Sequence, residues 1–198
     1  LATFATSYVT AENMLNRADV SSGDTVLIPG ASGGVGSALI QLANRRGAKT
    51  IAMASASKHG EVAKAGPTAL LPRSPTNLKN ALRSAIGQDT VTVVADVVGG
   101  PDWSRFIDAL ARGGRYTCAG AIAGPMVDFD LRTFYLRDLT FTGATIVPPG
   151  VFADLVGYIA RGEVNPMLAA TYPLANLPDA QQAFIDKLHV GNIVVTMD

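Results

Sequence analysis

The sequence predicts an α/β fold: a doubly wound, six-stranded parallel sheet with helices on both faces. Short apolar runs typical of buried strands alternate with segments of helical periodicity along most of the chain. The first of these runs, 25–28, leads into a glycine-rich turn over 30–36 and then into an amphipathic helix. Strands that alternate with helices pair in parallel through right-handed crossovers, and two βαβαβ halves make a Rossmann fold.

The expected elements follow in order from the spacing of apolar residues. A helix is predicted over 1–19, because Phe4, Tyr8 and Ala11 begin an apolar series at helical spacing. The six predicted strands are 25–28, 50–54, 69–71, 91–98, 115–119 and 139–143. Between them, helices are predicted from the glycines to Arg46, over 60–65, over 77–86, and from Trp103 to the pair Gly113–Gly114.

We expect one dinucleotide-binding domain over 1–198. Its predicted parts are the opening helix 1–19, a Rossmann core 20–145, and a C-terminal section 146–198 of helices and a strand. In that section, helices are predicted near 152–161 and 178–188, an extended segment at 170–173 and a strand at 192–196. Because helical spacing begins almost at Leu1, we expect the chain to be a fragment of a longer polypeptide.

Composition excludes several classes of protein. The 198 residues carry no formal net charge and no basic block, so nothing supports nucleic-acid binding. No apolar run reaches the ~18 residues of a membrane span, and the one cysteine, Cys118, excludes an internal disulfide framework. A cytoplasmic protein is therefore expected. With 48% hydrophobic and only 16% charged residues, some apolar surface is expected to be covered by a partner.

The turn Gly30-Ala31-Ser32-Gly33-Gly34-Val35-Gly36 is the strongest functional signal. Glycine allows a tight turn and close approach of a pyrophosphate, and the following helix offers free N–H groups to the anion. One fit to the spacing, G-x-x-x-G-x-G, is typical of short-chain dehydrogenases. Those enzymes need a Tyr-x-x-x-Lys pair, which this sequence lacks. A purely steric role of the glycines is the alternative to nucleotide binding.

The residues after the second predicted strand favour NADP(H) over NAD(H). An acidic residue about 20 positions beyond the glycines would bind the ribose hydroxyl of NAD. Here the stretch from Ser55 to His59 has no carboxylate and includes Lys58, and Arg73 follows the third predicted strand. These cations suit a 2′-phosphate, although they are also ordinary residues of solvated loops.

Asp96 stands inside the apolar run of the fourth predicted strand. A buried carboxylate is costly unless it is paired or hydrogen-bonded. Two interpretations stay open: Asp96 faces the cofactor crevice, or it caps the turn that follows.

Four stretches in matching order resemble the cofactor-binding half of the medium-chain dehydrogenase/reductase superfamily, on the side of quinone oxidoreductases and zinc-type alcohol dehydrogenases. The stretches are 7–11, 23–28 with 41–43, 96–100, and 191–195. The resemblance covers essentially the whole chain. It implies an NAD(P)H-dependent oxidoreductase that moves a hydride to or from a small carbonyl, alkene or quinone.

The resemblance also implies which residues bind the cofactor, while leaving the catalytic residues and the substrate unassigned. The implied positions are Thr10 near the nicotinamide, Gly30, Ala31, Ser32, Gly33, Gly34 and Val35 at the pyrophosphate, Ser55, Lys58 and Arg73 at the 2′-phosphate, Val97 near the end of the fourth predicted strand, and Gly120, Ala121 and Ile122 beside the nicotinamide. Zinc-type members carry a metal-binding cysteine before the opening helix. Ala2 stands at the nearest position here, so we expect no zinc ligand in this chain.

Family members carry an N-terminal GroES-like domain with most of the substrate site, and this sequence lacks it. That domain is one expected partner, and the C-terminal helices and strand are expected to pack on it. A second copy of the chain is another, through the edge strand 139–143. Two alternatives stay open for the function: an enoyl reductase domain of a polyketide or fatty-acid synthase, and a non-catalytic dinucleotide-binding sensor or interaction module.

Overall fold

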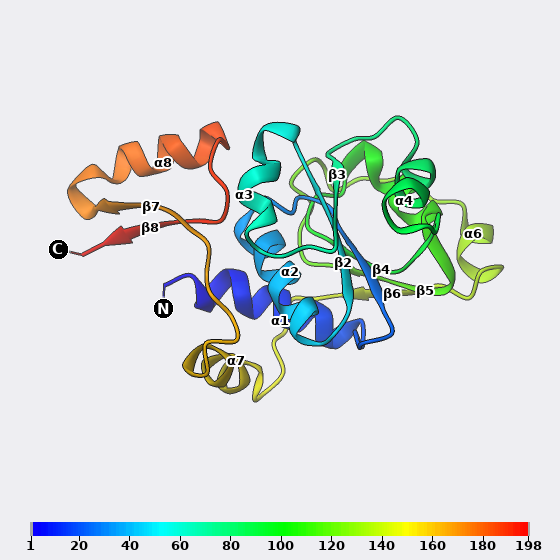
Figure 1. The fold of residues 1–198 in the computed structure, drawn as a ribbon, viewed down its shortest axis with the longest axis horizontal. Helices are drawn as coiled ribbons and strands as arrows, with labels where there is room; N and C mark the ends of the chain where they lie inside the picture. Colours follow the sequence, from blue (N-terminus) through cyan, green and yellow to red (C-terminus); the bar gives the residue numbers. More distant parts are fainter. Residues whose placement is uncertain (1, 198) are drawn as a thin grey trace.

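The structure is a computed structural model that describes residues 2–197. It confirms the expected six-stranded sheet, with all pairs parallel and the strand order β3-β2-β1-β4-β5-β6 (Figure 1). The order reverses beside β1, where β1 and β4 pair directly. Loops at the carboxyl ends of two such strands diverge to opposite faces and leave a crevice for a ligand. The expectation that the chain is a fragment was based on Leu1, which lies outside the described residues.

The bounds of most strands fall close to the predicted ones, but the fifth strand begins at Leu110 instead of 115. They are β1 (Thr25–Ile28), β2 (Lys49–Ala54), β3 (Ala69–Pro72), β4 (Val91–Asp96), β5 (Leu110–Cys118), β6 (Thr140–Gly143), β7 (Leu168–Pro173) and β8 (Asn192–Thr196).

The helices occupy the connections. After a π-helical turn η1 (Phe4–Tyr8), they are α1 (Val9–Arg17), α2 (Gly34–Arg45), α3 (His59–Ala63), α4 (Leu78–Ile86), α5 (Trp103–Asp108), α6 (Leu131–Tyr135), α7 (Val151–Ala160) and α8 (Leu177–Asp186), with the 3₁₀ turns η2 (Ala56–Lys58), η3 (Gly100–Asp102) and η4 (Leu174–Asn176). None of the helices in the described part of the chain combines the length and apolar character of a membrane span.

Two apolar cores lie on opposite faces of the sheet because successive strand residues point to opposite sides. In β1, Val26 and Ile28 face a core completed by α1, α2, α3 and α7. Leu27 between them faces a second core completed by α4 and α5. All three side chains are fully buried, as expected for a central parallel strand.

Three predicted boundaries are wrong, and each has a local reason. The fourth strand ends at Asp96 rather than 98, because the Asp96 carboxylate takes the N–H groups of Val98 and Gly99 away from strand pairing. The helix from Trp103 ends at Asp108, well before the glycine pair. There Leu110 begins β5 by pairing with Val91 of β4, and strand pairing overrides the helical spacing.

Within the C-terminal section, α7 packs on the first core, whereas β7, α8 and β8 form a separate unit. Strands β7 and β8 pair in parallel as a two-stranded sheet, and α8 connects them. Figure 1 shows this unit projecting from one side of the Rossmann sheet, with the end of α8 beside α3. The unit is joined to the glycine turn, since the Gly191 N–H donates to the Ser32 carbonyl at 2.9 Å.

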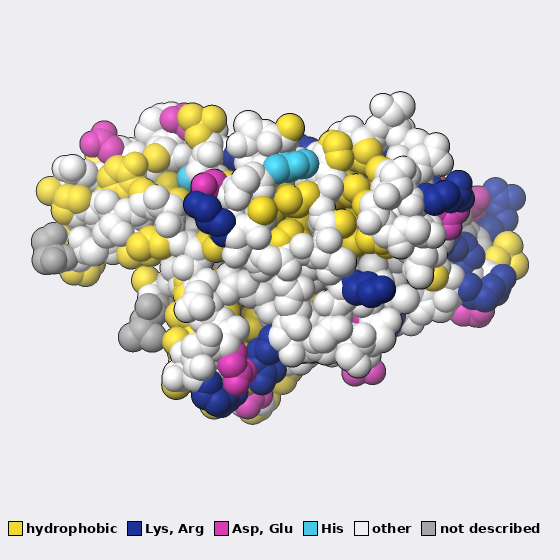
Figure 2. Space-filling view, in the orientation of Figure 1, with side chains coloured by type: hydrophobic (Ala, Val, Ile, Leu, Met, Phe, Trp, Pro, Cys, Tyr) yellow, Lys and Arg dark blue, Asp and Glu magenta, His cyan; other side chains and the backbone are white. Residues whose placement is uncertain are grey.

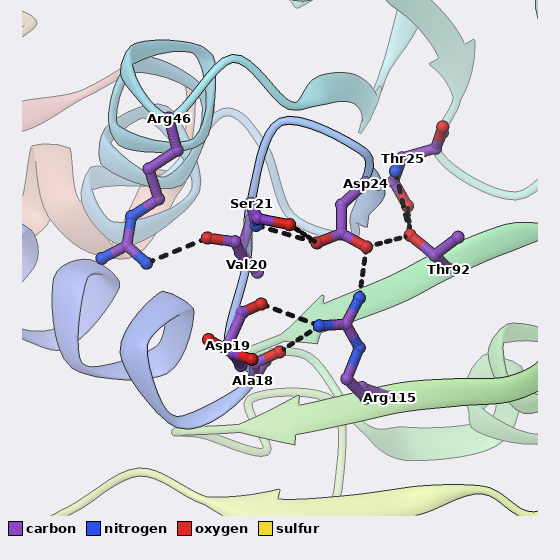
Figure 3. A network of polar contacts seen from close by, with 9 residues as sticks. All are labelled: Ala18, Asp19, Val20, Ser21, Asp24, Thr25, Arg46, Thr92 and Arg115. Atoms are coloured by element: carbon purple, nitrogen blue, oxygen red, sulfur yellow. Dashed lines mark hydrogen bonds and ion pairs between the residues drawn. The ribbon is translucent and has the colours of Figure 1, made fainter.

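A polar network fastens the start of the sheet (Figure 3). The buried Asp24 carboxylate accepts hydrogen bonds from the Ser21 N–H at 2.8 Å and the Thr92 hydroxyl at 2.7 Å, and it pairs with Arg115. The Arg115 guanidinium also donates to the carbonyls of Ala18 and Asp19. Burial raises the pKa of the Asp24 carboxyl, but its hydrogen bonds and Arg115 outweigh burial and hold the pKa below its usual value. The network therefore ties the end of α1 to β1, β4 and β5.

Replacing Asp24 by Asn should destabilise the chain by about 1–3 kcal/mol at pH 7, because Arg115 loses a buried charged partner. Denaturant unfolding measures the change. Since folding lowers the pKa of Asp24, its stabilisation is present above the unfolded value of about 3.9 and is lost as pH falls through the folded value. The gap between wild type and Asp24→Asn should therefore narrow below about pH 4.

Asp89→Asn is the matched control. Asp89 also pairs with an arginine, Arg83, but this pair lies at the surface, where the side chains are 40% and 62% exposed, so its loss should cost less than ~1 kcal/mol. Equal losses in the two variants would contradict the role given to Asp24.

Candidate cofactor-binding site

The glycine turn sits directly after β1, at the point where the strand order reverses. Gly30 has a φ of +68°, a left-handed conformation that favours glycine, and its carbonyl accepts the Gly33 N–H at 3.0 Å. The Ala31 N–H donates to the Met53 carbonyl of β2 at 3.1 Å. The turn is thus fixed by its own backbone and by the neighbouring strand, and α2 begins at Gly34.

Gly36 permits the close approach of α2 to this turn. A Cβ on Gly36 would lie 2.6 Å from the Ala31 Cα and closer still to the Gly30 carbonyl oxygen. Both are backbone atoms that cannot rotate away. This glycine is therefore required by packing, which supports the steric interpretation for this one position.

Gly33 is different. Its φ of −79° and ψ of 171° are open to any residue, and a Cβ would meet only the Gly30 carbonyl oxygen, at an ordinary 3.5 Å. Neither backbone conformation nor neighbouring atoms require glycine here. The missing side chain instead leaves open space at the start of α2, where the first N–H groups of a helix have no intrahelical acceptor. Such a place suits a pyrophosphate, whose charge the helix dipole also favours.

Asp96 proves to be the cap of its turn. Its fully buried carboxylate accepts the Val98 N–H at 2.7 Å, the Gly99 N–H at 3.2 Å and the Tyr116 hydroxyl at 2.9 Å. Burial raises the pKa of the carboxyl despite these bonds. The turn so fixed packs on the glycine turn, since a Cβ on Gly30 would lie 2.9 Å from the Val98 Cγ2.

The loop after β5 joins the same crevice. The Ile122 N–H donates to the Val97 carbonyl at 3.3 Å, and a Cβ on Gly120 would lie 3.2 Å from that oxygen. Ile122 itself is largely exposed. The structure therefore brings together the glycine turn, Val97 and the loop of Gly120, Ala121 and Ile122, which are distant in sequence.

The predicted cations also meet. Lys58 ends η2 just beyond β2, close enough to Arg73 for the two charges to interact. Burial lowers the pKa of Lys58, and the charges of Arg73 and Lys187 lower it further. Ser55 lies before η2 and is half-buried. Lys187, whose carbonyl accepts a hydrogen bond from the Lys58 ammonium, was not predicted. Because 129 residues separate Lys187 from Lys58, no local sequence pattern indicated that the two meet.

Sequence reasoning also missed Ser7 and Asn192. The Ser7 hydroxyl donates to the Asn192 side-chain oxygen at 2.8 Å, and this pair stands where a Gly34 side chain would be. The two residues also line a hollow between the N-terminal segment and β8, together with Thr3 and Thr6. Thr10 lies half-buried in α1 and does not line this hollow. The motifs 7–11 and 191–195 contained the signal, but only tertiary contact joins them.

A sequence model of the zinc-binding dehydrogenases matches residues 34–161, which is more than half of the chain and includes the helix after the glycines and the Asp96 turn. The chain belongs to this family. It is the cofactor-binding part of a medium-chain dehydrogenase/reductase, as the resemblance implied. Among residues 2–197, no three His, Cys, Asp or Glu side chains gather into a group that could hold a metal ion.

Known proteins similar to the chain include both reductases and dehydrogenases. Acryloyl-coenzyme A reductase of Sulfurisphaera tokodaii is 29% identical, over 89% of this chain and 52% of its own length. Erythronolide synthase EryA2 of Saccharopolyspora erythraea is 30% identical, over 96% of this chain but only 5% of its own length.

Two solved structures match the whole fold. One, from Sinorhizobium meliloti and assigned to the alcohol dehydrogenases, has a TM-score of 0.95 and 45% identity, and covers 100% of this chain and 55% of its own. A 2-octenoyl-CoA carboxylase reductase, in complex with NADP and 2-octenoyl-CoA, has a TM-score of 0.89 and 26% identity over 96% of this chain and 48% of its own. The chain thus spans about half the length of most of these relatives.

Gly36→Ala should destabilise the chain by more than about 2 kcal/mol, because the new Cβ overlaps the backbone of Ala31. The matched control is Gly60→Ala in α3, where a Cβ meets nothing within 4 Å and alanine is the better helix former. Thermal unfolding of both variants measures the difference. A Gly36→Ala variant as stable as Gly60→Ala would show that α2 does not depend on this contact.

Proposed function

We propose that the chain is the cofactor-binding half of an NADP(H)-dependent oxidoreductase that transfers a hydride between nicotinamide and a small carbonyl, alkene or quinone. The observation that carries the proposal is Gly33, which no steric or conformational demand explains and which opens the start of α2 at the switch point of the sheet. The reductases and dehydrogenases among its relatives support the reaction class.

In this proposal the bound cofactor supplies the hydride, and the chain binds and orients it. The turn from Gly30 to Val35 holds the pyrophosphate with backbone N–H groups. Val97 and the loop of Gly120, Ala121 and Ile122 line the crevice toward the nicotinamide, and Thr10 is proposed on that side from the resemblance alone. The residues that select the substrate are proposed to lie mainly outside this chain.

We favour NADP(H) over NAD(H). Ser55, Lys58 and Arg73 follow β2 and β3, and no carboxylate stands between 55 and 59 to bind a free ribose hydroxyl. The phosphorylated cofactor in the related carboxylase reductase is consistent with this choice.

Two exposed surfaces support two proposed partners. Phe184, Ile185 and Leu188 expose apolar side chains at α8, and Figure 2 shows hydrophobic side chains gathered over that unit. A GroES-like domain of the same polypeptide would cover them, in keeping with the longer relatives. The other surface is the edge strand β6, whose outward-facing backbone N–H and C=O groups are available to pair with a second copy of the chain. A cytoplasmic location is proposed from the composition.

An enoyl reductase unit of a larger synthase is the second candidate within enzymes. The similarity to erythronolide synthase and to acryloyl-coenzyme A reductase favours it specifically. Reduction of an enoyl thioester by the full-length protein would select it, whereas inactivity toward every acceptor despite cofactor binding would indicate a non-catalytic module.

NADPH should raise the melting temperature of the chain more than NADH at equal concentration. At about 100 times the dissociation constant the gain is ~2.7 kcal/mol, or roughly 5–10 °C for a chain of this size. Gly33→Ala should keep the unliganded melting temperature within a few degrees, because its Cβ is accommodated, yet abolish the NADPH shift. Scanning fluorimetry measures both.

The unliganded Gly33→Ala protein serves as the control for folding. If neither nucleotide shifts the wild-type melting temperature, cofactor binding by this chain is refuted. If Gly33→Ala keeps the full shift, the pyrophosphate does not approach Gly33.

The full-length protein should be a dimer in solution through antiparallel pairing of two β6 strands. Gly143→Pro should shift light scattering toward the monomer. The Ala144 N–H donates to the Cys118 carbonyl of β5, so the N–H of Gly143, one residue earlier, points away from β5 to the open edge, where proline removes the donor. Gly143→Ala, which keeps the backbone donor and whose Cβ would meet nothing within 4 Å, is the matched control and should leave the mass unchanged. A wild-type protein that is monomeric at micromolar concentration would contradict the edge interface.

A further inference from the structure

Three cationic side chains converge from three separate parts of the chain. Lys58 comes from η2 after β2, Arg73 from the segment after β3, and Lys187 from the end of α8. The charges of Arg73 and Lys187 both act on the Lys58 ammonium. Figure 1 shows why this is possible, since the end of α8 lies beside α3.

Lys187 is held in a defined position. It is the C-terminal cap of α8 with a φ of +55°, and its backbone carbonyl accepts a hydrogen bond from the Lys58 ammonium. Its own ammonium lies 3.5 Å from the centre of the Phe184 ring, a cation–π arrangement. The Phe184 ring also stacks on the His189 ring, with ring centroids 5.8 Å apart. The exposed Lys187 side chain thus packs against its own helix, near enough for its charge to act on Lys58.

The cation cluster formed by Lys58, Arg73 and Lys187 lacks a carboxylate partner among residues 2–197. Among the ion pairs of residues 2–197, none includes Lys58, Arg73 or Lys187. Asp102 is already bonded to Ser74 and Arg105, which lower its pKa together with a smaller effect of the Arg73 charge. Three like charges near one another without a paired acid repel, and this repulsion is relieved when a multivalent anion binds among them.

We propose that Lys187 is a specificity-determining residue that completes a three-cation site for the 2′-phosphate of NADP(H). The inference rests on the proposed function, and it adds a residue from the C-terminal unit to the expected Ser55, Lys58 and Arg73. A phosphate monoester carries between one and two negative charges at pH 7, which Lys58 and Arg73 hold from the sheet side. Lys187 meets it from the other side, so the bound phosphate bridges the Rossmann sheet and the α8–β8 unit.

The test separates the 2′-phosphate from the rest of the cofactor. Adenosine 2′,5′-bisphosphate and AMP differ only in that phosphate, and calorimetry with the full chain measures their dissociation constants. Lys187→Gly and Lys187→Asn both remove the ammonium, keep the carbonyl that holds Lys58, and suit a left-handed backbone. Each should weaken binding of the bisphosphate about tenfold and leave AMP unchanged, while Lys187→Arg should restore most of the affinity.

Lys58→Glu is the positive reference and should lose the preference for the bisphosphate. Lys49→Asn is the matched control, since Lys49 is an exposed lysine at the opposite, amino-terminal end of β2. If both Lys187 variants bind the bisphosphate like wild type while Lys58→Glu does not, the role of Lys187 is refuted and the proposed function stands. If wild type binds the bisphosphate and AMP equally, the NADP(H) preference itself fails. If it binds neither, the proposed cofactor site fails as a whole.

Discussion

The backbone contact between the first turn of α2 and the glycine turn is the constraint on which the site depends. Gly36 lets the helix lie against Gly30 and Ala31, where any side chain would overlap main-chain atoms. Ala31 in turn bonds to β2, Ser32 accepts from Gly191, and Val98 packs on Gly30. The sheet, the Asp96 turn and the C-terminal unit are therefore all positioned from one short stretch of backbone.

A second constraint is the burial of charge. Asp24 and Asp96 are both buried carboxylates, and each is stabilised by hydrogen bonds from segments far apart in sequence. Burial raises the pKa of both carboxyls. At Asp24 the hydrogen bonds from Ser21 and Thr92 and the charge of Arg115 outweigh burial and lower the pKa, whereas at Asp96 burial prevails. Asp24 joins β1, β4 and β5 at the start of β1. Asp96 shapes the turn that lines the crevice. Because both carboxylates are fully engaged within the chain, neither is free to act on a ligand.

Local patterns predicted most of the Rossmann sheet correctly because its central strands are continuous apolar runs with glycine or polar breaks. Prediction failed where strand pairing competed with local preference. Leu110 has helical spacing from Trp103, yet it begins β5 because Val91 offers a partner strand. The run that begins at Val91 stops at Asp96 because a side chain captures the next N–H groups.

The sequence by itself determined the fold class, the glycine turn, the absence of an acidic residue after β2, and the family, because each follows from short local motifs and from the order of those motifs along the chain. Tertiary structure alone decided that Asp96 is a cap, that Ser7 and Asn192 meet over Gly34, and that Lys187 joins Lys58 and Arg73. The physical reason is distance along the chain. A contact between residues 129 positions apart depends on how α8 packs beside α3, and no local spacing encodes that packing.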